Sequence, residues 1–204
     1  MAETFATHTS WNAQEIRTRS LEILEQMRIR NGEEVLEKYP HQLSGGMLQR
    51  IMIGIAMALQ PELLIADEPT TALDVTIQAQ ILDLMNKLKK EIGTSILFIT
   101  HDLGVVAEVC DQVVVMYCGR VVEKGSVYDI FDKPSHPYTE GLLNSIPKLG
   151  EYVEELESIP GNVPNPKYMP KGCKFAPRCK YAFDRCREEE PGFTDLGNGH
   201  QSRC

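Results

Sequence analysis

An uninterrupted apolar run that ends in two acids constrains this chain more than any other stretch. Residues 63–66 read Leu-Leu-Ile-Ala, and Asp67 and Glu68 follow directly. Because the run does not alternate with polar residues, it predicts a strand buried on both faces, as in a parallel sheet. Open α/β sheets bind ligands beyond the carboxyl ends of such strands. There Asp67 is suited to holding Mg²⁺ through its water shell and Glu68 to polarising an attacking water, although a strand that ends in two solvated acids has the same pattern.

A second stretch predicts an anion-binding helix N-terminus. Ser44, Gly45 and Gly46 precede an apolar-rich segment at 47–59 that has helical character. Serine is a favourable N-cap, and two glycines allow a phosphate to approach the backbone N–H groups closely. The helix N-terminus adds partial positive charge. A Ser-Gly-Gly alone is weak evidence, because loops contain it often.

The order of the motifs is far more specific than any one of them. LSGGM at 43–47 is followed by the acidic strand end, by TALD at 71–74 and by His101 behind a second apolar strand, Ser95–Thr100. This combination resembles the ATP-binding subunits of ABC transporters. The resemblance implies an α/β fold, a partial ABC ATPase domain with a parallel or mixed sheet and a helical subdomain.

The resemblance also implies roles at an ATP site. Asp67 matches the aspartate near Mg²⁺, Glu68 the residue that activates water, and His101 the switch histidine that contacts the γ-phosphate. On these grounds Glu68 and His101 are the candidate catalytic residues, with ATP and Mg²⁺ as the ligands.

The signature and the TALD motif imply a second subunit. Residues 44–46 match the signature, which in the family reaches across a dimer to the γ-phosphate on the other subunit. Asp74 matches the D-loop at the dimer interface. Met47 departs from the glutamine usual in the signature, a change familiar in the peptide and nickel importer branch.

The phosphate-binding loop G-x-x-x-x-G-K-[ST] occurs nowhere in the sequence. In the family that loop and a glutamine loop precede the signature, and the residues before Leu43 are too few to hold either. The chain therefore resembles the C-terminal part of a longer subunit, and we expect it to be inactive by itself.

Composition narrows the class of partner and the compartment. A net charge of −8 over 204 residues argues against a nucleic-acid partner. No apolar stretch approaches the ~18 residues of a membrane span, and the start MAETFATHTSW has an acid and no basic region, unlike a signal peptide. We therefore expect a soluble protein held by partners at the cytoplasmic face of the membrane.

Local patterns predict the remaining elements and a division into three parts. The predicted helices cover residues 12–30, with Asn12 and Glu15 as a capping pair, then 33–37, 76–91 and 103–108, and a hairpin joins 113–117 to 121–124. Asn31–Gly32 is expected to end the first helix. The expected domains are 1–60, the helical subdomain; 61–133, the C-terminal part of the ATPase core; and 134–204, an extension.

The extension resembles one branch of the family. The block DIFDKPSHPYTEGLLNSIP at 129–147 resembles the segment after the core in oligopeptide and dipeptide importer ATPases. The density of proline over 134–170 indicates a loop-rich extension rather than a second sheet domain.

Four of the six cysteines lie in the last 32 residues, a Pro- and Gly-rich tail with too few apolar residues for its own core; they are Cys173, Cys179, Cys186 and Cys204. Two disulfides are chemically feasible but unsuited to a reducing compartment. Structural zinc usually shows a pair with two to four residues between ligands, which is missing here. Four thiolates with wider gaps fit a cubane cluster at least as well.

The stretch GCKFAPRCKYAFDRC resembles the tail of the peptide-importer ATPases, which implies a 4Fe–4S cluster, with Zn²⁺ as the alternative. Nearby Lys and Arg residues would offset the cluster's negative charge or, alternatively, form an exposed basic patch. Against a zinc-finger DNA reader stands the lack of a recognition helix with its ligand spacing.

The function implied by the resemblance is ATP-driven import of peptides. The implied partners are a second ATP-binding subunit, transmembrane permease subunits and, indirectly, an extracytoplasmic peptide-binding protein. Nickel import is the rival within the family, since it shares GGMLQR. A DNA-repair or translation ABC protein lacks support here, because it would need coiled-coil arms or a second ATP-binding half. A further rival is a non-catalytic chain that donates its signature to a partner's nucleotide.

Overall fold

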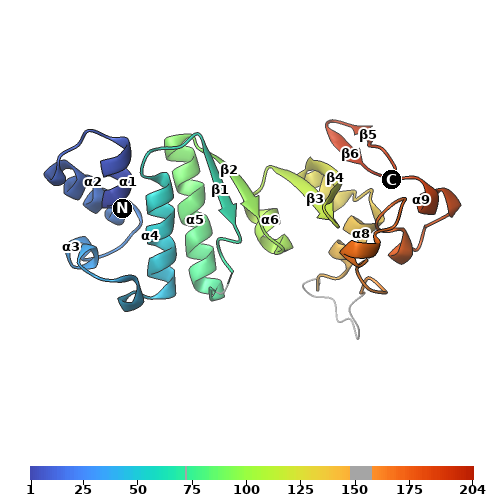
Figure 1. Cartoon of the computed structure of the whole chain (residues 1–204), viewed down its shortest axis with the longest axis horizontal. Helices are drawn as coiled ribbons and strands as arrows, with labels where there is room; N and C mark the ends of the chain where they lie inside the picture. The colour runs from blue at the N-terminus through green and yellow to red at the C-terminus, as the bar shows by residue number, and fades with distance from the viewer. Residues whose placement is uncertain (72, 148–157) are drawn as a thin grey trace. The chain divides into compact units, whose positions relative to one another are not determined.

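A computed structural model describes residues 1–71, 73–147 and 158–204. The chain divides into two compact units, Met1–His101 and Asp102–Cys204, which are described separately (Figure 1). The predicted three-part division remains an interpretation.

The first unit is helical around a short parallel sheet, and its predicted elements are confirmed. The helices are α1 (Ala2–His8), α2 (Ala13–Gln26), α3 (Gly32–Leu36), the 3₁₀ turn η1 (Pro40–Gln42), α4 (Gly45–Met57) and α5 (Val75–Ile92). The strands are β1 (Leu63–Asp67) and β2 (Ser95–Ile99), paired in parallel with Ile65 opposite Leu97. Helix α1 was not predicted from the sequence.

Capping side chains fix the helix boundaries. The Asn12 side chain accepts hydrogen bonds from the backbone N–H groups of Gln14 and Glu15, and the Asn12 N–H donates to the Glu15 carboxylate at 2.7 Å, which confirms the predicted capping pair. The prediction that Asn31–Gly32 ends this helix was wrong. Helix α2 ends at Gln26, because Arg28 adopts a left-handed φ of 56°, and Gly32 instead begins α3.

The core of the first unit lies on one face of the sheet. Leu64 and Phe98 pack with buried residues of α2, α4 and α5, such as Leu24, Met57 and Leu84. The alternate residues of both strands face away and are exposed; they are Leu63, Ile65, Leu97 and Ile99.

The expectation that the strands are buried on both faces was therefore wrong for this chain. Ile65 is 61% exposed and its partner Leu97 is 50% exposed. Parallel strands normally carry apolar residues on both faces because both faces are covered. The sequence has the apolar pattern of a sheet with two covers, and among the described residues only one face is covered.

The second unit contains an antiparallel sheet in the order β3-β4-β6-β5. Its strands are β3 (Gln112–Tyr117), β4 (Arg120–Ser126), β5 (Thr194–Gly197) and β6 (His200–Ser202). Its helices are α6 (Leu103–Val109), α7 (Val127–Asp132), α8 (Pro137–Asn144) and α9 (Asp184–Glu188), with 3₁₀ turns η2 (Pro166–Tyr168) and η3 (Ala176–Arg178). The predicted hairpin is confirmed, with Cys118 and Gly119 at positive φ in its turn.

The cysteine-containing tail shares the core of this hairpin. Phe175 is buried against Tyr117 and Val122, and Cys118 packs beside them, as Cys110 does in a neighbouring cluster. Two strands of the tail extend the sheet, which the sequence did not predict. The proline-rich segment was predicted to be loop-rich; its residues 148–157 lie outside the described residues.

A fully buried carboxylate joins three segments of the second unit. Glu123 on β4 accepts hydrogen bonds from the N–H groups of Ser135 and His136 at 2.7 and 3.0 Å, and from Nε2 of His200 at 2.8 Å. Burial lowers the pKa of His136 to about 4, so this ring is neutral at pH 7. Glu123 thereby ties β6 and the start of α8 to the hairpin.

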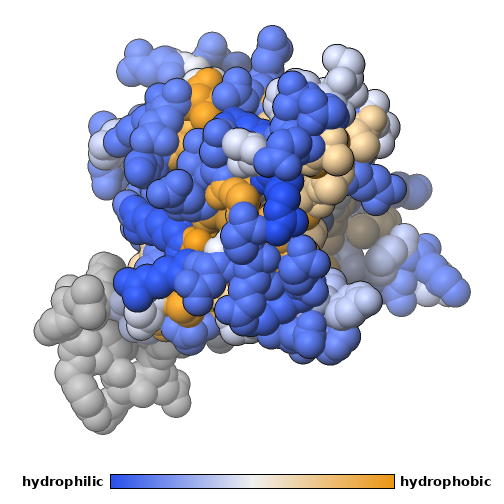
Figure 2. All heavy atoms as spheres, turned by 90° about the vertical axis from the view of Figure 1, so that its left-hand side faces the viewer, coloured by the Kyte–Doolittle hydropathy of each residue, from blue (hydrophilic) through white to orange (hydrophobic). Residues whose placement is uncertain are grey.

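The face turned to the viewer in Figure 2, on the side of α2 and α3, is mostly hydrophilic with small apolar patches. Arg17 of α2 forms ion pairs with Glu33 and Glu37, and all three side chains are exposed. Among the described residues, every helix is too short or too polar to cross a membrane.

Candidate functional site

The carboxyl ends of β1 and β2 bring Glu68 and His101 into contact. Nδ1 of His101 donates to Oε1 of Glu68 at 3.1 Å, although 33 residues separate them in sequence. The contact follows from the parallel pairing of the two strands, since Asp67 lies opposite Ile99 and both chains turn just beyond. Both side chains remain open to solvent, 46% for Glu68 and 76% for His101, so a ligand can reach them.

Glu68 is held as an anion in a tight turn. Its φ is 45°, an unusual value for a residue with a side chain. The hydrogen bond from His101 and then that from the Thr71 hydroxyl hold the pKa of this carboxyl below its ordinary value. At neutral pH the group is therefore ionised, as a proton acceptor must be.

Asp67 lies at the end of β1 and is exposed beside Glu68. The two adjacent acids are carried to the same edge of the sheet by the strand. Carboxylate oxygens exposed in this way suit Mg²⁺, which keeps several of its waters.

The predicted signature residues form the N-terminus of α4. The Ser44 side chain accepts from the Met47 N–H at 3.3 Å and caps the helix. A Cβ at Gly45 would meet nothing within 4 Å, whereas one at Gly46 would lie 3.1 Å from Cγ2 of Ile77. The close approach of α5 thus leaves little room for a side chain at Gly46. The space beside Gly45 is open, so a ligand can reach the N-terminus of α4 there.

Asp74 caps α5 by accepting from the Ile77 N–H at 3.0 Å. The close approach of Gly46 to Ile77 places the two capped helix ends next to each other. The capping hydrogen bond is a structural reason for an aspartate at position 74. Its exposed carboxylate also lies beside the signature residues.

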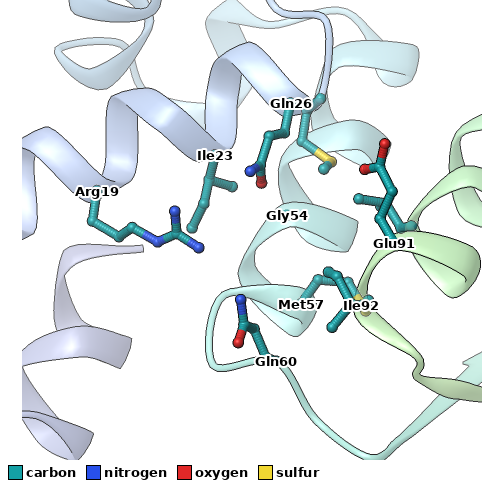
Figure 3. A pocket seen from close by; sticks show the side chains of 10 residues that line it. Arg19, Ile23, Gln26, Gly54, Met57, Gln60, Glu91 and Ile92 are labelled. Atoms are coloured by element: carbon teal, nitrogen blue, oxygen red, sulfur yellow. The ribbon is translucent and has the colours of Figure 1, made fainter.

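A cavity of about 200 Å³ in the first unit lies apart from these motifs (Figure 3). Its lining includes Arg19 and Gln26 of α2, Met57 of α4, Gln60, and Glu91 of α5. No predicted ATP-site residue lines it. The candidate site is instead an open surface at the strand ends.

The four tail cysteines are free thiols that influence one another. Burial first, and then the neighbouring thiols of Cys179, Cys173 and Cys186, raise the pKa of Cys204. Within the described ranges, no three His, Cys, Asp or Glu side chains form a group placed to hold a metal ion. The donor chemistry fits a metal or cluster, and the thiols would have to lose protons and move closer to bind it.

Two contacts of the Glu68 turn were missed by sequence reasoning. Thr71 Oγ1 donates to Oε2 of Glu68 at 2.9 Å, and Gln49 Nε2 of α4 donates to the Pro69 carbonyl. TALD and LSGGMLQR contain both residues, but only the fold shows that their side chains meet the turn after β1.

Two known families match parts of the chain. Residues 2–71 match the family described as "ABC transporter", and residues 122–186 match "Oligopeptide/dipeptide transporter, C-terminal region". The first match covers the signature and the acidic strand end, and the second covers most of β4, all of α8 and three of the tail cysteines.

Whole-chain relatives agree with these matches. The oligopeptide transport ATP-binding protein AppD of Bacillus subtilis is 51% identical over 100% of this chain and 62% of its own length. The dipeptide transport ATP-binding protein DppD of Escherichia coli is 49% identical over 99% of this chain and 62% of its own. The chain thus spans about three fifths of these relatives.

Solved structures support the fold. CbiO1 of Clostridium perfringens, part of an ABC transporter complex, has a TM-score of 0.56 and 32% identity, covering 65% of this chain and 51% of that one. The ADP- and Pi-bound dimer of the ATP-binding cassette MJ0796 has a TM-score of 0.51 and 31% identity, covering 59% and 50%. The predicted α/β fold class and the resemblance drawn from the motifs are confirmed.

Proposed function

We propose that this chain is part of an ATPase that drives peptide import. The proposal rests on its membership of the ABC-type ATP-binding proteins of oligopeptide and dipeptide transport. The observation that carries the proposal is the contact of Glu68 with His101 at the strand ends. Identity of 51% along the whole chain to a named oligopeptide transport protein supports peptides over nickel as the cargo.

In the proposed mechanism, ATP hydrolysis takes place beyond β1 and β2. Glu68 accepts the proton of the attacking water, which its ionised state and exposure permit. His101 contacts the γ-phosphate, and Asp67 holds Mg²⁺ through water. The magnesium ion, when bound, offsets the negative charge that develops on the phosphate oxygens.

The proposed partners follow from the signature. Residues 44–46 and Asp74 act on a nucleotide held by a second ATP-binding subunit, while permease subunits and an extracytoplasmic peptide-binding protein complete the importer. Their association would hold the chain at the cytoplasmic face of the membrane. The open space at Gly45 and the capped, adjacent ends of α4 and α5 support an intermolecular role for this surface.

The isolated chain is proposed to be inactive, because its sequence has no phosphate-binding loop to cradle the β- and γ-phosphates. It can still present its signature to a nucleotide held elsewhere. By itself, the chain would therefore act as a non-catalytic partner that donates its signature to another subunit's nucleotide.

Ser44→Arg tests the signature role. The change places bulk and charge at the N-terminus of α4, so we expect hydrolysis in a paired complex to be lost while the chain keeps its fold. Steady-state ATPase rates and circular dichroism of the paired wild-type and variant proteins measure this. Ser10→Arg, an exposed position outside the helices, is the control. Equal rates in Ser44→Arg and wild-type complexes would refute the role.

We also propose that Cys173, Cys179, Cys186 and Cys204 bind a 4Fe–4S cluster, with Zn²⁺ as the alternative ligand. Two observations support this. Burial first, and then neighbouring thiols of the same group, raise the pKa of Cys179 and of Cys204, and the tail sequence resembles that of the peptide-importer ATPases. A bound cluster would cross-link η3, α9 and the end of β6.

Metal analysis of anaerobically purified chain tests the cysteine site. We expect brown protein with about four irons per chain, the number that this cluster type requires. Cys110→Ser should leave the iron content unchanged, and Cys179→Ser should lower it. Colourless protein with one zinc per chain would contradict the cluster and support a structural zinc site.

A further inference from the structure

Both oxygens of the Glu68 carboxylate have a partner within the chain. Oε1 receives the hydrogen bond from His101, and Oε2 receives that from the Thr71 hydroxyl at 2.9 Å. The Thr71 N–H also donates to the Glu68 carbonyl at 3.2 Å, so the three-residue step folds back on itself. One rotamer of Glu68 satisfies both side-chain contacts at once, and this fixes the direction of the carboxylate.

The backbone of the same turn is tied at both ends. The Glu68 N–H donates to the Ile99 carbonyl at 2.9 Å, which continues the β1–β2 pairing into the turn. One residue later, the Pro69 carbonyl accepts from Nε2 of Gln49. These hydrogen bonds hold Glu68 at its φ of 45°, a conformation that costs free energy and persists only where its surroundings impose it.

Gln49 connects this turn to the helix that begins with the signature. It lies on α4 about one turn beyond Gly45 and Gly46, and it is partly buried. A helix is rigid over so short a distance. A displacement of the α4 N-terminus therefore also moves the Gln49 amide that donates to the Pro69 carbonyl.

We propose that Thr71 and Gln49 are positioning residues for Glu68: Thr71 orients its carboxylate, and Gln49 couples its turn to the signature end of α4. The coupling rests on the proposed function. There, residues 44–46 act on the nucleotide held by the partner subunit, while Glu68 acts on the other nucleotide of the dimer. Gln49 then links the two nucleotide sites of the dimer through one chain.

The test measures the titration of Glu68 directly in the 204-residue chain. Carbon-13 NMR follows its side-chain carboxyl against pH in wild type, Thr71→Val, Thr71→Ser and Gln49→Met. Valine has the shape of threonine without the donor, serine keeps the hydroxyl, and methionine has the length of glutamine without the amide. Thr76→Val and Gln14→Met, at exposed helix positions, are the matched controls.

Thr71→Val should raise the pKa of Glu68, since a hydrogen bond to its charged form is lost, and Thr71→Ser should restore it. Gln49→Met should raise it too, and the Thr71 amide should exchange roughly two- to tenfold faster with deuterium, as expected for one lost hydrogen bond. Both controls should match wild type.

Wild-type titration of Glu68 in Thr71→Val would overturn the role of Thr71. Unchanged exchange of the Thr71 amide in Gln49→Met would overturn the role of Gln49. A merely structural contribution would lower the melting temperature without moving the Glu68 titration. Failure of the proposed function is a separate result: it would appear as hydrolysis that does not depend on Glu68, with the titration results unaffected.

Discussion

Glu68→Gln will lower ATP hydrolysis about 10²–10⁴-fold, the range expected for loss of a general base. Glutamine keeps the shape and can still accept from Thr71, but it cannot take a proton from water. The rate is measured after the chain is co-expressed with the part of the Bacillus subtilis relative that has no counterpart here. Nucleotide affinity should change little, since binding does not use the base.

Glu62→Gln is the matched control, because it changes an exposed acid of the same type just before β1. It should retain the wild-type rate. A Glu68→Gln complex that keeps more than about a tenth of the wild-type rate would show that another group activates the water.

The second large effect concerns the stability of the unit Asp102–Cys204. Glu123→Ala removes the acceptor of the Ser135 and His136 N–H groups and of the His200 ring. Each buried donor left without its acceptor costs ~1–3 kcal/mol, so the loss of these three hydrogen bonds costs at least ~3 kcal/mol. We expect the free energy of unfolding in urea to fall by this amount. Glu108→Ala, at an exposed position of α6, should leave it within ~0.5 kcal/mol.

A loss below ~1 kcal/mol in Glu123→Ala would mean that water replaces the carboxylate and that β6 is held by its backbone alone. The backbone contribution is visible in the Arg203 N–H, which donates to the Val122 carbonyl at 2.7 Å.

Sequence reasoning predicted the elements well where the signal is local. Asn12 and Ser44 were predicted to cap helices because each side chain can satisfy free N–H groups, and each does so in the structure. The helix predicted over 76–91 is confirmed as α5, and its apolar residues, such as Ile81 and Leu88, are buried. Burial of a strand face is not local, so Ile65 and Leu97 were placed wrongly.

The candidate site divides in the same way. Glu68 and His101 were predicted from the order of the motifs that resemble the family, and the structure brings their side chains into contact. Thr71 and Gln49 were missed because a hydroxyl in a turn and an amide in a helix are common residues in both places. The Glu123 network was missed since it joins β4 with residues 12 and 77 positions away.

ATP hydrolysis by three samples tests the central claim, that this chain supplies the water-activating residues of an ATPase and depends on a phosphate-binding loop outside its sequence. The samples are the chain alone, the remaining part of the Bacillus subtilis relative alone, and the two co-expressed. The account predicts Mg²⁺-dependent turnover only for the co-expressed pair, and its loss in Glu68→Gln. Turnover by the chain alone, or a stable pair that binds ATP without hydrolysing it, would contradict the account.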